Sequence, residues 1–235
     1  MNTPPIKIFA DGADRAGILK LYELGEVDGF TTNPTLMRKA GVSDYEAFAR
    51  DILSVIRDLP VSLEVFSDDF AEMRRQALKI AAWGDNVYVK IPVMTRSKDS
   101  CAGVIRDLSA EGVKVNVTAV LTIEQVCAVQ QSLHPDTPAI VSMFAGRIAD
   151  TGVDPVPVLR RAKDILTARS QVELLWASCR EALNIRHAEQ AGCDIITVTH
   201  DILKKKALFG KDLTELSLET VKMFHDDAAA AGYQL

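Results

Sequence analysis

Short apolar runs alternate with longer amphipathic stretches along nearly the whole chain. The runs are rich in branched aliphatic residues, which favour extended backbone. The stretches between them carry apolar residues at helical spacing. This alternation predicts eight strand–helix units. The predicted strands are Ile6–Ala10, Gly29–Pro34, Val61–Phe66, Val87–Lys90, Lys114–Val120, Pro138–Phe144, Val172–Ser178 and Cys193–Val198.

The helices predicted between these strands have recognisable first turns. Ser43 is expected to cap the second helix, with Glu46 completing a capping box, and Thr122 is expected to cap the fifth. The predicted helices are Asp14–Leu24, Asp44–Asp58, Asp69–Trp83, Ser100–Glu111, Ile123–Leu133, Pro155–Arg169, Ile185–Ala191 and Asp201–Phe209, followed by a last amphipathic helix over about Leu213–Ala231.

Strands as apolar as these suit a parallel sheet that is covered by helices. Eight such units fit an α/β fold of one domain over residues 1–235, a single (β/α)8 TIM barrel with an additional C-terminal helix at about 213–231. A doubly wound open sheet is the alternative. It usually has fewer strands and a glycine-rich first turn, which this sequence lacks.

Composition narrows the function classes. The net charge is −5, and no basic tract is dense enough to indicate binding to nucleic acid or an anionic membrane. The 4 cysteines form no CxxC pair and no histidine cluster accompanies them, which argues against a metal site or a disulfide framework. Free thiols favour a reducing cytoplasm. Residues 1–7 lack the apolar core of a leader, and no apolar window is long enough for a membrane span.

Lys90 is the first candidate for chemistry. It follows three residues of strand composition, and Pro92 two positions later indicates that the strand stops there. An ammonium in an apolar setting is costly unless it is paired or loses its proton, and a neutral lysine attacks carbonyls to form Schiff bases. The plainer interpretation is an edge strand whose lysine points into water.

Polar residues elsewhere fall repeatedly at the ends of the predicted strands. The active sites of (β/α)8 barrels lie at the C-terminal ends of the strands, so these side chains are expected to converge on Lys90. They are Asp11, Thr31, Asn33, Glu64, Asn116, Thr118, Ser142 and Ser178.

Glu64 and Asp11 are the candidate proton carriers for a Schiff-base reaction, which moves a proton at every stage. Each has a structural alternative: Asp11 as a helix cap near Asp14, and Glu64 as an ion-pair partner of Lys90 alone. Thr118 is a hydroxyl suited to hold a water beside Glu64, although its presence in a strand is also explained by β-propensity.

Arginines near the last strands suggest a site for a phosphate dianion. Arg147 follows the sixth strand, and Ser178 and Arg180 follow the seventh. Barrels often bind phosphate there, and guanidinium groups suit it. The alternative is surface pairing of Arg147 with Asp150 and of Arg180 with Glu181.

At these positions the chain resembles the transaldolase family and its smaller fructose 6-phosphate aldolase-like relatives. The matching segments lie in order over nearly the whole chain: GFTTNPTLM, LEVF, VYVKIPV, VNVTAV, SMFAGRIAD, ASCR and GCDIITV. TTNP and VKIP in this order are specific. The resemblance implies an enzyme that needs no metal or organic cofactor and acts on sugar phosphates.

The resemblance also implies a role for each matched residue. Lys90 forms the Schiff base with a ketose phosphate, Asp11 is the acid and base for C–C cleavage, and Glu64 activates a water held with Thr118. The residues expected to contact the sugar are Thr31, Asn33, Asn116, Ser142 and Phe144, and those expected to hold its phosphate are Arg147, Ser178 and Arg180. Aldolase members of the family carry Gln and Tyr at the positions of Glu64 and Phe144. This pair therefore favours transfer of a dihydroxyacetone unit to an aldose phosphate.

Several positions depart from the family pattern. They are Gly12, Ala149, Trp176, Thr199, His200 and the loop Met94–Cys101. Trp176 is large enough that it could reshape the pocket, and its role and that of His200 stay open. The departures together leave the pathway open, between pentose phosphate metabolism and a specialised route to a seven- or eight-carbon sugar phosphate. Two alternatives to a transaldolase remain: an aldolase of the same mechanism and a non-catalytic sugar-phosphate-binding barrel. A homo-oligomer is expected, because small relatives form rings, and the free cysteines favour a cytoplasmic location.

Overall fold

The computed structural model describes residues 5–169 and 171–234 and confirms the predicted barrel. Eight strands are hydrogen-bonded in chain order into a closed barrel, and every pairing is parallel. Pairing of the first strand with the eighth excludes the open-sheet alternative. The strands are β1 (Lys7–Asp11), β2 (Gly29–Thr31), β3 (Val61–Glu64), β4 (Val87–Pro92), β5 (Val115–Val120), β6 (Ala139–Met143), β7 (Val172–Trp176) and β8 (Ile195–Thr199).

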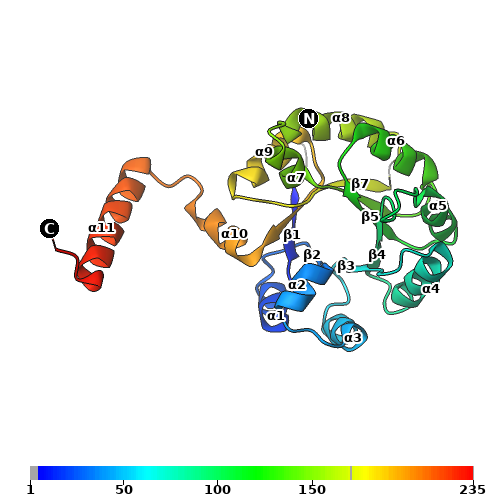
Figure 1. The fold of residues 1–235 in the computed structure, drawn as a ribbon, viewed down its shortest axis with the longest axis horizontal. Helices are drawn as coiled ribbons and strands as arrows, with labels where there is room; N and C mark the ends of the chain where they lie inside the picture. Colours follow the sequence, from blue (N-terminus) through cyan, green and yellow to red (C-terminus); the bar gives the residue numbers. More distant parts are fainter. Residues whose placement is uncertain (1–4, 170, 235) are drawn as a thin grey trace. The chain divides into compact units, whose positions relative to one another are not determined.

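Helices surround the ring of strands on its outside (Figure 1). They are α1 (Arg15–Leu24), α2 (Pro34–Lys39), α3 (Tyr45–Val55), α4 (Phe70–Ala81), α5 (Ala102–Ala110), α6 (Ile123–Ser132), α7 (Ala145–Asp150), α8 (Pro155–Leu166) and α9 (Leu183–Ala191). The chain continues through α10 (His200–Lys205), a short 3₁₀ helix η1 (Lys206–Leu208) and α11 (Leu213–Ala231).

Local side-chain chemistry explains where the helices begin. Thr122 caps α6 as predicted, and Gln125 completes its capping box. The prediction that Ser43 caps the second predicted helix is wrong. Asp44 caps α3 instead, because its carboxylate accepts a hydrogen bond from the Ala47 amide at 2.9 Å.

Two helices, α2 and α7, are absent from the predicted elements. Each is 6 residues long, which is less than two turns and too short to show helical periodicity. Proline at the first position of α2 and the Asn33 cap favour its start. The predicted helix Asp201–Phe209 is also wrong in extent, because α10 ends at Lys205 and tightens into η1.

An apolar layer inside the barrel separates the polar strand ends from the rest of the lumen. Phe9, Tyr88 and Ile140 each lie two residues before a polar candidate and belong to this layer with Leu175 and Ile195. Side chains two apart on a strand share a face, so the residues that follow point into the same lumen at the C-terminal ends. The fold thus gathers Asp11, Lys90 and Ser142 above an apolar floor.

By its internal contacts the chain divides into two units, one ending at Leu203 and the other beginning at Lys204. The first holds the barrel and the second holds α11, the additional C-terminal helix that the sequence predicts. Every helix in the described part of the chain is too short or too polar to cross a lipid bilayer. The prediction that residues 1–7 form no leader lies partly outside the described residues, because these begin at residue 5.

Candidate active site

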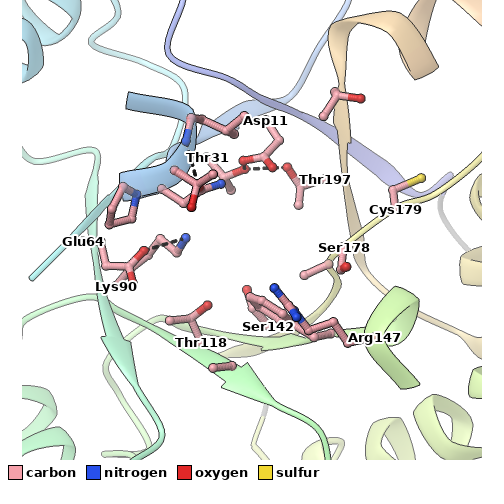
Figure 2. Close-up of a pocket in the computed structure, with 18 of the residues that line it drawn as sticks. Asp11, Thr31, Glu64, Lys90, Thr118, Ser142, Arg147, Ser178, Cys179 and Thr197 are labelled. Carbon is pink, nitrogen blue, oxygen red and sulfur yellow. Dashed lines mark hydrogen bonds and ion pairs between the residues drawn. The ribbon is translucent and has the colours of Figure 1, made fainter. Parts of the chain in front are cut away.

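A cavity of about 460 Å³ opens at the C-terminal ends of the strands. This volume suits a small-molecule ligand. Its lining includes all of the predicted site residues except Asn116. In Figure 2 the side chains of Lys90 and Glu64 lie on one side of the opening, and those of Ser178 and Arg147 lie on the other. The predicted site residues in the lining are Asp11, Thr31, Asn33, Glu64, Lys90, Thr118, Ser142, Phe144, Arg147, Ser178 and Arg180.

Lys90 is buried at the rim of this cavity, with only 6% of its surface exposed. Its Nζ donates a hydrogen bond of 2.8 Å to the backbone carbonyl of Thr32 and lies 3.2 Å from Oε2 of Glu64. The interpretation of an edge strand with a lysine in water is therefore wrong. An amine held this way is dry and fixed in direction, as a nucleophile requires.

Strand register places the two candidate proton carriers on strands near the lysine. Glu64 of β3 is the direct partner of Lys90 in the ladder, and Lys90 is in turn the partner of Asn116 on β5. On β1, Asp11 pairs in register with Thr31 of β2 on one side and with Thr199 of β8 on the other. These pairings follow from β-strand geometry, so the positions of the acids do not depend on flexible loops.

Asp11 sits in a network of hydroxyl groups. The Thr31 hydroxyl donates to its carboxylate at 2.8 Å and lies 2.5 Å from the hydroxyl of Thr197 (Figure 2). Burial raises the pKa of Asp11, and the Lys90 charge and the Thr31 hydrogen bond only partly offset this effect. The α1 cap is Asp14, which accepts from the Gly17 amide, so the interpretation of Asp11 as a helix cap is wrong.

Thr118 presents a buried hydroxyl with no hydrogen-bond partner among the described residues. It lies on β5 opposite Pro92 of β4, where a β-bulge between Val117 and Val120 interrupts the pairing of β5 with β6. Ala119 beside it has φ 59°, a conformation that non-glycine residues rarely adopt. Backbone strain of this kind often accompanies a functional site, here by fixing Thr118 at the cavity.

Asn116 has a different setting from the other predicted sugar contacts. It is fully buried, donates to Ser62 Oγ at 3.0 Å and accepts from Ser142 Oγ at 2.7 Å. Asn116 therefore orients Ser142, which does line the cavity. Asn33 caps α2 by accepting from the Leu36 amide at 3.0 Å, and its Nδ2 has no partner among the described residues.

The three residues predicted to hold a phosphate all line the cavity, and Arg147 and Ser178 lie on the side that faces Lys90 (Figure 2). Arg147 of α7 lines the cavity and carries no acidic partner in the described part of the chain. Arg180 forms an ion pair with Asp150, which corrects the alternative pairing with Glu181. Gly146 lies so close to this loop that a Cβ there would come 1.7 Å from the carbonyl oxygen of Ser178. Helix α7 and the loop after β7 are therefore packed backbone to backbone.

Sequence reasoning missed several lining residues. Thr197 and Thr199 lie two residues apart on β8 and both line the cavity, so the two-residue alternation of a strand is the sequence signal that indicates them. Cys179 also lines it, and burial raises the pKa of its thiol to about 11. No grouping of His, Cys, Asp and Glu able to hold a metal occurs among residues 5–169 and 171–234.

Two of the residues that depart from the family pattern, Trp176 and His200, lie outside the cavity lining. Trp176 is almost fully buried, and its ring centroid is 6.3 Å from that of His187 on α9. Trp176 does not line the cavity and lies on the side of β7 that faces α9. His200 packs against Gly12 and Gly17, and its Nε2 is buried with no partner among the described residues.

Comparison with known proteins gives a consistent match. Residues 8–235 match the family model described as "Transaldolase/Fructose-6-phosphate aldolase". A protein of Dehalococcoides mccartyi named "Probable transaldolase" is 36% identical over 199 residues, which are 84% of this chain and 88% of that protein. One of Streptococcus equi subsp. zooepidemicus with the same name is 33% identical over 228 residues, covering 96% and 99%.

A solved structure supports the fold alone. The crystal structure of a dihydrodipicolinate synthase family protein from Coccidioides immitis superposes with a TM-score of 0.63 at 12% identity. The match covers 100% of this chain and 80% of that one.

Proposed function

This chain belongs to the transaldolase and fructose-6-phosphate aldolase family and is an enzyme, and we propose that it is a transaldolase that works through a Schiff base on Lys90. It transfers a dihydroxyacetone unit from a ketose phosphate donor to an aldose phosphate acceptor. The observation that carries the proposal is the buried Lys90 amine, held between a backbone carbonyl and Glu64.

The first half-reaction breaks a C–C bond of the donor. The Lys90 amine attacks the C2 carbonyl of the ketose, and the resulting carbinolamine loses water to give an iminium ion. Glu64, with a water held by Thr118, supplies and removes the protons of these steps. Asp11 then takes the proton of the C4 hydroxyl, and the C3–C4 bond breaks. The aldose phosphate leaves, and the bond electrons remain on Lys90 as an enamine.

The second half-reaction reverses these steps with a new aldehyde. The enamine carbon attacks the acceptor carbonyl, and Asp11 returns its proton to the new hydroxyl. Water then adds to the iminium ion, and the ketose product leaves as the Lys90 amine is restored. Thr31, Asn33, Phe144 and Ser142 contact the sugar, with Asn116 orienting Ser142.

Charge placement at the far side of the cavity supports a phosphorylated substrate. Arg147, which has no acidic partner in the described residues, and Ser178 lie opposite Lys90 (Figure 2). A phosphate bound there would orient the carbon chain across the cavity toward the amine. Arg180 joins this site by exchanging its Asp150 partner for the phosphate.

The decisive experiment traps the Schiff base. The protein is mixed with fructose 6-phosphate, reduced with borohydride and digested for mass spectrometry. A mass addition on the peptide that holds Lys90 is expected. Lys90→Met should abolish both the adduct and turnover, whereas Lys114→Met, which removes a lysine bonded to the Asp85 carbonyl, should change neither. Adduct formation on another lysine, or none, would refute the proposal.

Product analysis separates transfer from the alternatives. With donor and an acceptor aldehyde, a transaldolase gives a new ketose phosphate, while an aldolase of the same mechanism releases dihydroxyacetone without an acceptor. A non-catalytic sugar-phosphate-binding barrel would bind donor but form no adduct.

We propose a cytoplasmic enzyme, of pentose phosphate metabolism or of a specialised route to a seven- or eight-carbon sugar phosphate. The departures at Gly12, Thr199 and His200 favour the specialised route, because they lie beside Asp11 and Thr199 lines the cavity. A panel of four- to eight-carbon aldose phosphates tests it: strongest activity with the five- and four-carbon acceptors would favour pentose phosphate metabolism.

A further inference from the structure

Building on the proposed Schiff-base function, we propose that Tyr45 is a positioning residue for Lys90. Its hydroxyl replaces a missing hydrogen bond between β2 and β3 and so reserves the Thr32 carbonyl for the lysine amine. Tyr45 is the first residue of α3 and belongs to none of the predicted site residues.

The β2–β3 ladder shows where the bond is missing. The amides of Phe30 and Thr32 donate in turn to the carbonyls of Pro60 and Ser62, at 2.8 and 3.2 Å. A parallel ladder continued by one residue would have the Glu64 amide donate to the Thr32 carbonyl. Strand β2 ends at Thr31, and this bond is not formed.

Both groups of the missing bond have found other partners. The Glu64 amide donates to the Tyr45 hydroxyl at 2.7 Å, and the Thr32 carbonyl accepts from Lys90 Nζ at 2.8 Å. The Tyr45 hydroxyl in turn donates to the Glu64 carbonyl at 3.2 Å. One phenol thus satisfies both backbone polar groups of Glu64, whose carboxylate faces the same lysine at 3.2 Å.

The phenol is suited to this dual use. Burial raises the pKa of Tyr45 above the ordinary range of a phenol, so the hydroxyl stays protonated and both donates and accepts. The ring is fixed edge-on against Phe66, with centroids 4.7 Å apart, and lies 6.1 Å from Trp83. Its orientation is therefore set by packing rather than by the hydrogen bonds alone.

Without the Tyr45 hydroxyl, the Glu64 amide would lose its acceptor and would form the ladder hydrogen bond to the Thr32 carbonyl instead. A buried amide without a partner is costly, so this exchange is favoured. Lys90 would lose its acceptor and its fixed direction, and Glu64 would shift with its backbone. The rate of attack on the donor should fall, whereas the phosphate side of the cavity is unchanged.

The test compares Tyr45→Phe with the unchanged protein in rapid-mixing borohydride trapping with fructose 6-phosphate. Tyr45→Phe keeps the ring contacts and removes only the hydroxyl. The expected result is an adduct rate constant per trappable site that falls about tenfold or more, with the inhibition constant of inorganic phosphate unchanged. The matched control is Tyr22→Phe, which removes a phenol that donates to Asp58 at 2.8 Å outside the cavity.

Each outcome decides the question. A purely structural role would lower the melting temperature and the number of trappable sites but leave the rate constant per site unchanged, and that result overturns the inference. If Tyr45→Phe does not fold, Phe66→Leu loosens the ring while keeping the hydroxyl: a slower rate per site supports the inference, and an unchanged rate overturns it. Absence of any adduct in the unchanged protein overturns the proposed function as well.

Discussion

Asp11 is the residue in which the demands of folding and of chemistry oppose each other most clearly. Its carboxylate is buried, is bonded to Thr31 and lies near the Lys90 charge. Burial raises its pKa in spite of both favourable contacts, so the ionised form that takes a proton is the form that the fold resists.

This conflict predicts a gain of stability from Asp11→Asn. Between the ordinary carboxyl pKa and the raised folded value, the folded state binds more protons than the unfolded state, so stability declines as pH rises through that window. At neutral pH the variant should be more stable than the unchanged protein, because asparagine carries no charge for burial to penalise. Its turnover should fall by about 10²-fold or more, as for loss of an acid–base group.

Denaturant unfolding at neutral pH and again near the ordinary carboxyl pKa measures the effect, which should shrink at the acidic value. Asp14→Asn is the control, because asparagine also caps a helix and leaves α1 intact. Equal stability of Asp11→Asn and the unchanged protein at neutral pH would contradict the argument.

At this scale the sequence predicted which polar residues gather at the cavity, since they lie at the ends of apolar strands. It did not predict how they are held. Thr32 acts through its backbone carbonyl and Tyr45 through a hydroxyl from a neighbouring helix, and neither role has a sequence pattern. The burial of Asn116 between two serines likewise depends on which strands become neighbours.

Among the elements, α7 and the loop after β7 have the closest contact. Gly146 lies in the first turn of α7 and faces the backbone of Ser178, which itself has φ 63°. A side chain at position 146 cannot be accommodated by a rotamer change, because the atom it would meet belongs to the backbone.

Gly146→Ala is therefore expected to displace the loop that carries Ser178 and Arg180. Overpacking typically costs about 1–3 kcal/mol, and KM for the phosphorylated donor should rise about tenfold or more. Gly103→Ala is the matched control, since a Cβ in that helix meets nothing within 4 Å. Steady-state kinetics and thermal unfolding of both variants check the prediction. Unchanged KM and melting temperature in Gly146→Ala would show that the loop is not constrained.

The strands and longer helices were predictable because hydrophobic periodicity reports them directly. Helices α2 and α7 were not, since 6 residues give too little periodicity to separate from a loop. Both carry cavity residues, Pro34 and Arg147 among them. The elements hardest to predict are thus ones that shape the site.

For the whole molecule, α11 raises the question of assembly. Leu213, Val221 and Phe224 fall on one side of this helix and are 78%, 61% and 63% exposed. Apolar residues grouped on a helix face indicate an interface, and we expect this helix to contribute to a homo-oligomer.

Val221→Glu combined with Phe224→Glu should convert the protein to the mass of a single chain in light scattering after gel filtration. Lys222→Glu, on the opposite face of the same helix, should leave the assembly intact. A single-chain mass for the unchanged protein at micromolar concentration would contradict the expectation.

The anchor of the Lys90 amine has a consequence for redesign of this barrel. Its acceptor is a main-chain oxygen, which every amino acid at position 32 supplies. Most substitutions at position 32 would leave this acceptor in place but remove the buried Thr32 hydroxyl, which donates to the Ser62 carbonyl at 3.1 Å, so their cost lies in packing and in that hydrogen bond rather than in the anchor of Lys90. Substitutions at the phosphate end would likewise leave this acceptor in place, because Arg147 and Ser178 lie across the cavity from Lys90 (Figure 2).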